Sequence, residues 1–275
     1  MTGIFETVGV SIVAVCGIVL GWLFSRLRKP FWTLGYFLPF LLIAAQVAVT
    51  MFNSLAFNPP FCWVTAGRVR FVVLAFAITM GLTTPLSRLH SRVKKLIVCG
   101  AMLIAVVRLA ILPFAVPAVI RGYLYSLETK FGTGGVCLQT TDYTCGPAAA
   151  VTALAKLGIR AQEGELAVLS HSAPVTGTLP HCLYQAIQRK YAAQGLECQW
   201  RYFESPNQLK AADAALVVVK DSFLSDHCVA VLDVTDAGLI IADPVLGTLY
   251  LSHPEFEKVW RFCGILLTRN SQQNI

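Results

Sequence analysis

The sequence lacks two motifs that would point to metal or nucleotide chemistry. None of its nine cysteines is spaced as a C-x-x-C pair, which argues against a zinc ribbon and against a thioredoxin-type redox motif. It also has no G-x-x-x-x-G-K-[ST] loop, so no ATPase module is expected. Internal repeats and low-complexity tracts are missing as well. We therefore expect neither a metal nor an organic cofactor.

Acidic residues are almost absent from the first 120 residues, which carry ten lysines and arginines but only one acid, Glu6. The rest of the chain has 12 basic and 14 acidic residues. The net charge of +7 therefore comes from the apolar half, where basic residues flank hydrophobic segments as topology signals do. The C-terminal half has no positive surface for a phosphate backbone, so nucleic-acid binding is not expected.

Long apolar stretches dominate the first half of a chain that is 56% hydrophobic, with a mean hydropathy of +0.64. A membrane-spanning helix needs about 20 residues. Four stretches are of that order and predict four transmembrane helices, at about 8–24, 31–52, 71–86 and 96–120. The first is not expected to be a cleaved signal peptide, because Glu6 precedes it and no small-residue cleavage site comes before the basic patch at 26–29.

Positive charges around these segments predict the orientation of the anchor. Two basic groups should lie on the cytoplasmic side: Arg26, Arg28 and Lys29, and Arg88, Arg92, Lys94 and Lys95. The loop between the second and third helices has only Arg68 and Arg70. Both ends of the anchor, and with them the C-terminal half, are then expected outside the cytoplasm.

The fourth segment is the least regular. Arg108 lies near its middle, and Pro113 and Pro117 predict a kink or a re-entrant turn. Loss of this crossing would place the C-terminal half inside the cytoplasm. Arg108 is expected to reach an interface or a carbonyl group rather than to serve a substrate path.

The second half of the chain reads as a separate folded unit. We expect a transmembrane anchor over residues 1–122, a glycine-bearing linker over 123–135, a folded domain over 136–270 and a polar tail over 271–275. Helices are predicted at 146–157 and 180–193. Strands are predicted at 199–203, 214–220, 227–234, 239–242 and 248–251. Helices followed by antiparallel strands predict an α+β domain.

Cys145 immediately precedes the helix predicted at 146–157. The free N–H groups and the dipole at a helix N-terminus favour an anion, so a thiolate is easily formed there. Gln139, six residues upstream, can direct its side-chain amide at a developing oxyanion together with the Cys145 N–H group. His227 opens a strand and is the natural base, and Asp243 ends the next strand, where it can orient the imidazole.

These residues carry a family resemblance. Gln139-x5-Cys145-Gly-Pro-Ala, then His227 opening a valine-rich strand, then Asp243-Pro-x-x-Gly, resembles the bacteriocin-processing, double-glycine peptidases among the papain-like cysteine peptidases. The later Leu251-Ser-x3-Phe-x3-Trp260 is similar too, so the resemblance spans about half the chain. It implies a papain-like fold with Cys145 as nucleophile, His227 as base and acid, Asp243 as orienting residue and Gln139 as oxyanion donor.

The resemblance also implies a function. Members of this family that are fused to exporters cut leader peptides after two glycines. We therefore expect a membrane-anchored cysteine endopeptidase, in a bacterial cytoplasmic membrane, that processes leader or exported peptides in contact with an export machine. Two alternatives stay open: a thioester-forming peptidyl or acyl transferase, and a catalytically silent peptide-binding adaptor of an export system.

Further residues admit both a functional and a structural interpretation. Five cysteines of the domain are either disulfide-bonded or simply buried: Cys137, Cys182, Cys198, Cys228 and Cys263. Gly134-Gly135 is either a self-processing site or, as we expect, a plain linker. For His171, His181, His253, Asp142 and Asp226 we expect surface, turn or capping roles.

Overall fold

The computed structural model describes residues 2–28, 30–51, 68–86, 88–221 and 226–269. It divides the chain into two compact units, Met1–Val119 and Ile120–Ile275. Lys29, the end of the second predicted span at Phe52 and the polar tail at 271–275 lie outside the described residues. The two units are described separately below.

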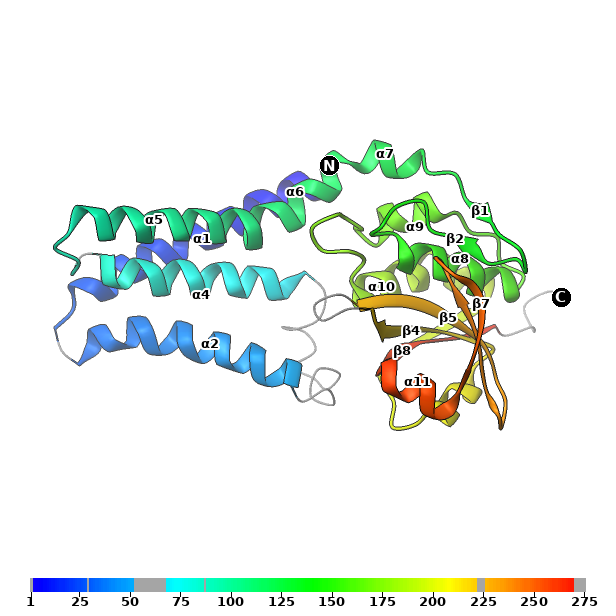
Figure 1. Ribbon diagram of the computed structural model, residues 1–275. Helices are drawn as coiled ribbons and strands as arrows, with labels where there is room; N and C mark the ends of the chain where they lie inside the picture. Colours follow the sequence, from blue (N-terminus) through cyan, green and yellow to red (C-terminus); the bar gives the residue numbers. More distant parts are fainter. Residues whose placement is uncertain (1, 29, 52–67, 87, 222–225, 270–275) are drawn as a thin grey trace. The chain divides into compact units, whose positions relative to one another are not determined.

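The first unit consists of helices (Figure 1). They are α1 (Thr2–Arg26), the short 3-10 turn η1 (Phe31–Thr33), α2 (Leu34–Met51), α4 (Val69–Leu86), α5 (Arg92–Val106), the π-helical turn η3 (Val107–Ile111) and α6 (Leu112–Val119). Within the described residues, three segments are long and apolar enough to cross a membrane: Phe5–Arg26, Phe31–Val49 and Val69–Leu86. A fourth exists if α5 and α6 are counted as one bent span. The unit thus has three to four such apolar helices, where the sequence predicts about four.

The fourth segment is bent by 46° between Arg92–Leu109 and Leu112–Val119. The bend coincides with η3, directly before Pro113. Proline has no N–H group to donate and its ring clashes with the preceding turn, so the helix widens and changes direction there. The kink expected from the prolines is therefore present. Arg108 lies in the widened turn and is exposed on the surface of the unit.

Glycines bring α1 and α4 together. A Cβ atom on Gly17 would lie 2.2 Å from Thr79 Oγ1 and 2.8 Å from the carbonyl oxygen of Phe76, and one on Gly21 would lie 2.6 Å from the carbonyl oxygen of Met80. Small residues four apart allow two backbones to approach closely, which is how helices associate within a bilayer.

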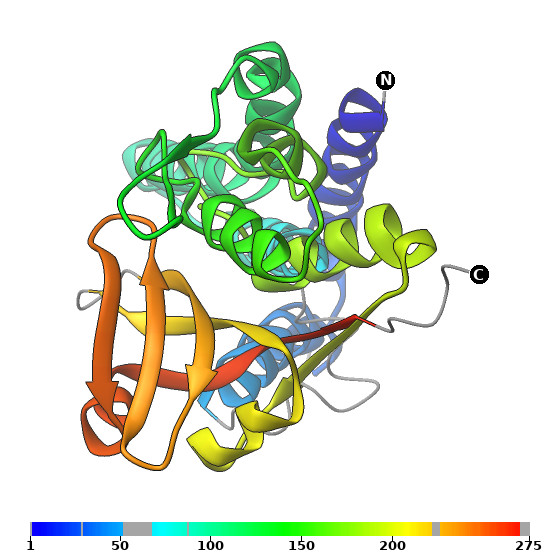
Figure 2. The ribbon, with the colours of Figure 1, turned by 90° about the vertical axis from the view of Figure 1, so that its right-hand side faces the viewer.

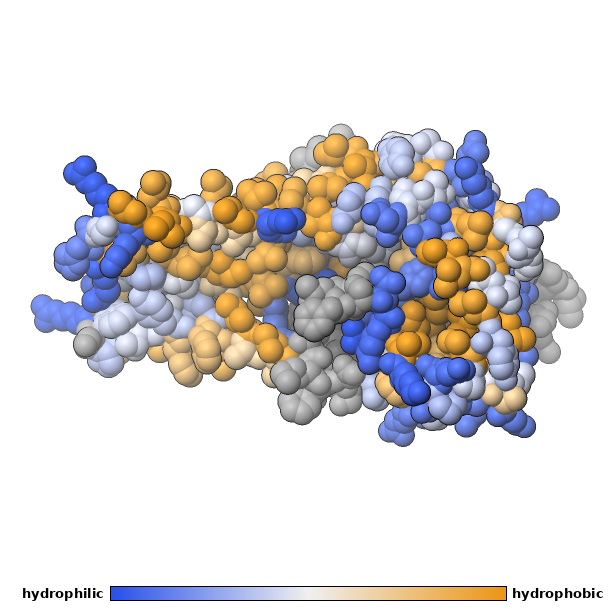
Figure 3. All heavy atoms as spheres, in the orientation of Figure 1, coloured by the Kyte–Doolittle hydropathy of each residue, from blue (hydrophilic) through white to orange (hydrophobic). Residues whose placement is uncertain are grey.

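The outer surface over α5 and its neighbours is mainly hydrophobic (Figure 3).

Basic residues mark one end of this helical unit. The Arg88 guanidinium, after α4, donates to the carbonyl oxygen of Ser25 at 3.3 Å and lies 4.3 Å from the centre of the Trp32 ring. The connection between α1 and α2 therefore lies beside the connection between α4 and α5. At the start of α4, by contrast, Arg68 pairs with Glu6 at 2.7 Å.

The second unit holds a two-stranded and a six-stranded antiparallel sheet. The small sheet pairs β1 (Lys130–Phe131) with β2 (Cys137–Leu138). The large sheet has the order β3-β8-β4-β5-β6-β7, with β3 (Leu196–Tyr202), β4 (Ala214–Lys220), β5 (Asp226–Val234), β6 (Gly238–Asp243), β7 (Gly247–Ser252) and β8 (Trp260–Arg269). The helical elements are α7 (Arg121–Tyr125), α8 (Cys145–Lys156), α9 (Glu163–Leu169), α10 (Pro180–Tyr191), η4 (Ala192–Gln194), η5 (Pro206–Ala211) and α11 (His253–Val259).

The six-stranded sheet has a hydrophobic core on each face. Alternate side chains of β5 point to opposite faces. Ala230 packs in the core formed with α8 and α10, which lie together on one side of the sheet (Figure 2). Val229 and Val231 pack in the other core, with Phe256 of α11 and the fully buried Trp260. The α+β architecture is the one the sequence predicts.

The segment at 123–135, expected as a linker, takes part in the fold. It contains most of α7 and all of β1, and Leu124 is completely buried. A Cβ atom on Gly164 of α9 would lie 2.3 Å from the carbonyl oxygen of Leu124, so α7 sits directly against α9. Sequence patterns did not predict α9 or β8, because a seven-residue helix shows little periodicity and β8 follows α11 without a turn signal.

Candidate active site

Cys145 is the first residue of α8 and is half-buried. The helix forms readily because it is rich in alanine and has Pro147 in its first turn, where a missing N–H group costs nothing. Gly146 is required by crowding, since a Cβ there would lie 3.0 Å from Thr178 Cγ2. The thiol thus sits where the free N–H groups of a largely buried helix favour a negative charge.

His227 and Asp243 lie side by side at the ends of β5 and β6. The antiparallel register pairs Ala230 with Ala242, which places the two side chains diagonally across the strands. Nε2 of His227 lies 3.0 Å from Oδ1 of Asp243, and the side chains are only 16% and 11% exposed. Oδ1 also accepts the N–H groups of Val245 at 2.7 Å and Leu246 at 3.2 Å, so the turn after Asp243 fixes the carboxylate.

The His227 imidazole carries a positive charge at neutral pH. Burial lowers the pKa of His227, but its hydrogen bonds with Asp243 and with the Cys145 thiol, and the negative charges of both groups, outweigh burial and raise the pKa to about 10. For Asp243, burial raises the pKa, yet the hydrogen bonds from His227, Val245 and Leu246 lower it overall. These shifts favour an ionised carboxylate and a protonated imidazole, and the second ring nitrogen, Nδ1, is not engaged by the bond to Asp243.

Gln139 is joined to this group through its backbone. Its N–H group donates to the carbonyl oxygen of Pro244, directly after Asp243, at 3.0 Å. The preceding strand β2 is held against α8 by the N–H group of Cys137, which donates to Thr152 Oγ1 at 2.8 Å. Oε1 of Gln139 is buried and has no hydrogen-bond partner. This amide oxygen is therefore an unsatisfied hydrogen-bond acceptor.

The structure thus pairs His227 with Asp243 by a hydrogen bond, places Cys145 close enough to influence the imidazole, and anchors Gln139 to the turn beside Asp243. No group of histidine, cysteine and carboxylate side chains among the described residues is arranged to hold a metal ion.

The domain's other cysteines are free thiols. This holds for all five positions considered for disulfides: Cys137, Cys182, Cys198, Cys228 and Cys263. Burial raises the pKa of Cys137, Cys198 and Cys263 to about 12 and that of Cys228 well above its ordinary value. These thiols stay protonated at neutral pH and pack as small apolar groups.

The Gly134-Gly135 pair forms the turn of a hairpin. Both glycines have positive φ angles, of 83° and 75°, between β1 and β2. The N–H group of Gly132 donates to the carbonyl oxygen of Val136 at 2.8 Å, and Val136 is fully buried. In the folded domain the bond after the second glycine is therefore not extended for cleavage.

The remaining polar candidates have structural contacts. Asp226 pairs with Arg261 at 2.7 Å, and His253 Nε2 lies 2.9 Å from the carbonyl oxygen of Thr235. His181 Nε2 lies 2.9 Å from Gln185 Nε2, and burial lowers the pKa of His181. His171, after α9, adopts a left-handed backbone conformation, and Asp142 is exposed.

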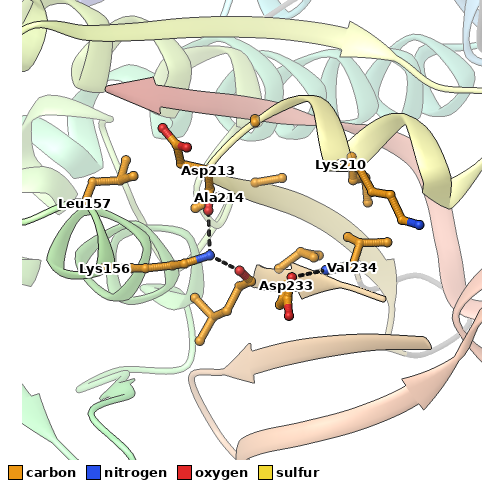
Figure 4. A pocket seen from close by; sticks show the side chains of 12 residues that line it. Lys156, Leu157, Lys210, Asp213, Ala214, Asp233 and Val234 are labelled. Atoms are coloured by element: carbon orange, nitrogen blue, oxygen red, sulfur yellow. Dashed lines mark hydrogen bonds between the residues drawn. The ribbon is translucent and has the colours of Figure 1, made fainter. Parts of the chain in front are cut away.

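A cavity of about 560 Å³ lies at the far end of α8 from Cys145 (Figure 4). Lys156, the last residue of α8, extends its ammonium group along the wall and donates to the carbonyl oxygens of Asp213, at 2.6 Å, and of Leu232. The cavity contains none of the four candidate catalytic residues. Lys156 therefore ties the end of the helix to the sheet.

The family of the chain follows from a comparison with family models. Residues 135–274 match the model of the peptidase C39 family. The chain belongs to the peptidase C39 family. This confirms the family expected from the sequence, and with it the papain-like α+β class of the C39 domain.

Two proteins are similar to about half of the chain. An uncharacterized protein of Methanothermobacter marburgensis is 26% identical over 151 residues, which span 55% of this chain and 99% of that protein. One from Methanothermobacter thermautotrophicus is 24% identical over 137 residues, 50% of this chain and 90% of the other.

Two solved structures are also similar to about half of the chain. The peptidase domain of Streptococcus ComA, a bifunctional ABC transporter, has a TM-score of 0.42 and 21% identity, over 48% of this chain and 96% of its own. A double glycine motif protease from an AMS/PCAT transporter, solved in complex with the leader peptide, has a TM-score of 0.41 and 18% identity. The match covers 53% of this chain and 96% of the protease chain.

Proposed function

We propose that this C39 peptidase is a membrane-anchored cysteine endopeptidase in which Cys145 is the nucleophile, His227 the base and acid, and Asp243 the residue that orients the imidazole. The observation that carries the proposal is the placement of His227, which is hydrogen-bonded to Asp243 at 3.0 Å and lies near enough to the Cys145 thiol for that thiol to raise the pKa of the imidazole. A buried, positively charged imidazole beside a thiol at a helix N-terminus favours the thiolate, which is the reactive form of cysteine.

The reaction begins when the Cys145 sulfur attacks the carbonyl carbon of a peptide bond and the C=O electron pair moves to the oxygen. The Gln139 amide and the Cys145 N–H group stabilise the resulting oxyanion. As the oxyanion collapses, the C–N bond breaks, the leaving amine takes the proton from Nδ1 of His227, and a thioester remains. Water, deprotonated by the now neutral imidazole, hydrolyses the thioester and regenerates the thiolate–imidazolium pair.

Asp243 acts through the imidazole. Its carboxylate accepts the N–H group at Nε2, which fixes the tautomer that leaves Nδ1 facing Cys145. Because Oδ1 also accepts two backbone N–H groups, Asp243 keeps its negative charge while the imidazole gains and loses a proton.

The substrate that we propose is a leader or exported peptide, delivered by an export machine. Membership in the C39 family supports a peptide substrate. The apolar helices of the first unit support a position in a lipid bilayer. Because basic residues gather at the end of the helical unit where Arg88 contacts Ser25, we place that end in the cytoplasm and the peptidase domain outside it.

The test uses the purified full-length protein in detergent with peptides that contain a double glycine. Wild type should cleave them, and Cys145→Ala, Cys145→Ser and His227→Ala should not. Cys16→Ala, which removes an exposed thiol from α1, is the matched control and should retain activity. Products joined to an added amine would indicate a transferase instead, and peptide binding without Cys145-dependent turnover would indicate an adaptor.

A further inference from the structure

A carboxylate outside the candidate catalytic group is completely buried beside the segment that carries Gln139 and Thr140, called the oxyanion loop below. Glu163, the first residue of α9, has no exposed surface. Oε1 accepts the N–H group of Thr140 at 2.8 Å, and Oε2 accepts the Thr140 hydroxyl at 2.6 Å. None of the ion pairs found among the described residues involves Glu163. Both carboxylate oxygens are thus used to hold one residue, which is the neighbour of Gln139.

Simple packing does not require such a group. Burying a carboxylate without a cationic partner is costly unless hydrogen bonds satisfy its oxygens. An apolar residue of similar size would fill the same space without that cost. What the carboxylate adds is geometric, because two short bonds to the N–H group and the hydroxyl of a single residue fix that residue's position and rotation.

Gln139 depends on its backbone for its orientation. On one side its own N–H group is held by the carbonyl oxygen of Pro244 at 3.0 Å, and on the other side Thr140 is held by Glu163. Its side-chain Oε1 has no partner that would fix the amide directly. An oxyanion donor must be aimed in advance at the position where charge develops. The contacts that do this here are those of the two flanking backbone segments.

The Glu163 end of this contact is itself fixed. Its N–H group donates to Thr129 Oγ1 at 2.9 Å, and the Thr140 hydroxyl also lies 3.3 Å from the carbonyl oxygen of Glu128. The chain between α7 and β1, the first turn of α9 and the oxyanion loop therefore form one hydrogen-bonded cluster.

We propose that Glu163 is a positioning residue that holds Gln139 in place to stabilise the oxyanion. The proposal rests on the function proposed above, because it requires an acyl-transfer reaction at Cys145. Glu163 does not touch the reacting atoms; it acts through Thr140 on the donor.

Two substitutions separate geometry from charge. Glu163→Ala removes both acceptors, whereas Glu163→Gln can accept the Thr140 N–H group with Oε1 and donate from Nε2 to the Thr140 hydroxyl oxygen. Losing an oxyanion donor costs roughly 100- to 1000-fold in kcat, so misplacing it in Glu163→Ala should lower kcat by about 10-fold or more with little change in KM. Glu163→Gln should restore kcat to within about threefold of wild type.

Matched controls use the same helix and the same thiol. Glu165→Ala removes a carboxylate two residues away that pairs with Lys190 at the surface, and should leave kcat unchanged. Alkylation of Cys145 by iodoacetamide forms no oxyanion, so its rate in Glu163→Ala should equal that of wild type. Thr140→Val removes one of the two hydrogen bonds and should give a smaller loss of kcat. It provides the test if Glu163→Ala does not fold.

The deciding experiment is a double-mutant cycle between Glu163→Ala and Gln139→Ala, measured as kcat for a peptide substrate. If Glu163 acts through Gln139, its substitution lowers kcat in the wild type and has no further effect in Gln139→Ala. Effects that multiply, or iodoacetamide alkylation that slows in parallel with kcat, would overturn the proposal while leaving the peptidase intact. A wild type without Cys145-dependent cleavage would overturn the proposed function, and this inference with it.

Discussion

Replacing Asp243 by asparagine isolates the charge of the orienting residue. Asparagine retains an oxygen that can accept the Nε2–H group of His227 and the N–H groups of Val245 and Leu246. The protein therefore keeps the hydrogen bonds and loses only the negative charge. Any change in activity then measures how much that charge favours the imidazolium.

The size of the effect follows from the geometry. Unit charges 3.0 Å apart attract by roughly 5 kcal/mol at an effective dielectric constant of about 20. The cost of burying the two charges offsets part of this attraction. Opposite charges at such distances shift pKa values by about one to three pH units. Asp243→Asn should therefore lower the pKa of His227 from about 10 by that amount. The alkaline limb of the pH profile of kcat/KM should move down by about one to three pH units.

The assay is kcat/KM for peptide cleavage from pH 5 to pH 10.5. At pH 9, Asp243→Asn should lose about twofold for a shift of one unit and about 100-fold for a shift of three, relative to its own maximum, because its imidazole has lost the proton that the leaving amine needs. Asp233→Asn is the matched control, since Asp233 lies on β5, the strand of His227, but is exposed and accepts the N–H group of its neighbour Val234. Equal alkaline limbs for wild type and Asp243→Asn would refute the ion-pair argument.

Three further predictions concern the rest of the protein. The pKa of His227 is about 10 in the folded domain and about 6.5 in an unfolded chain. Protonated His227 therefore stabilises the folded state fully below about pH 6.5, and this stabilisation is lost as the pH rises through about 10. The melting temperature of the domain should fall from pH 7 to pH 10.5, and it should fall less in His227→Ala. Iodoacetamide at pH 8 should modify Cys145 and spare Cys137, Cys198, Cys228 and Cys263, whose thiols are buried or partly buried and have raised pKa values, until the domain is unfolded. Peptide mass spectrometry can check this, and equal modification of all five cysteines would contradict the prediction. Gly17→Leu should separate α1 from α4 and lower the melting temperature of the detergent-solubilised helical unit, whereas Gly9→Leu, at a position with open space around it, should not.

Short stretches of sequence predicted the helices and strands whose residues have strong preferences of their own. The strand expected at 214–220 is β4, and the helix expected after Cys145 is α8, because valine-rich runs and an alanine-rich segment opened by proline carry their preferences in the sequence itself. The 123–135 segment, whose glycines are typical of a linker, contains β1 and most of α7. Only the burial of Leu124 against α9 shows that it belongs to the fold.

The candidate catalytic residues were found because each follows a recognisable signal: a cysteine before a helix, a histidine opening a strand and an Asp-Pro turn. Glu163 was missed for the opposite reason. A glutamate at the start of a short helix normally faces solvent and favours the helix dipole. Its contact with Thr140 links residues 23 positions apart and exists only after α9 has packed against the oxyanion loop.

The most direct test of the central claim is labelling of Cys145 by an impermeant, thiol-directed peptide electrophile in intact and in lysed cells. We predict that the wild type is labelled in intact cells, that Cys145→Ala and Cys145→Ser abolish the labelling, and that His227→Ala weakens it. Labelling only after lysis would keep the enzyme and place its domain in the cytoplasm. Absence of Cys145-dependent labelling before and after lysis would contradict the account.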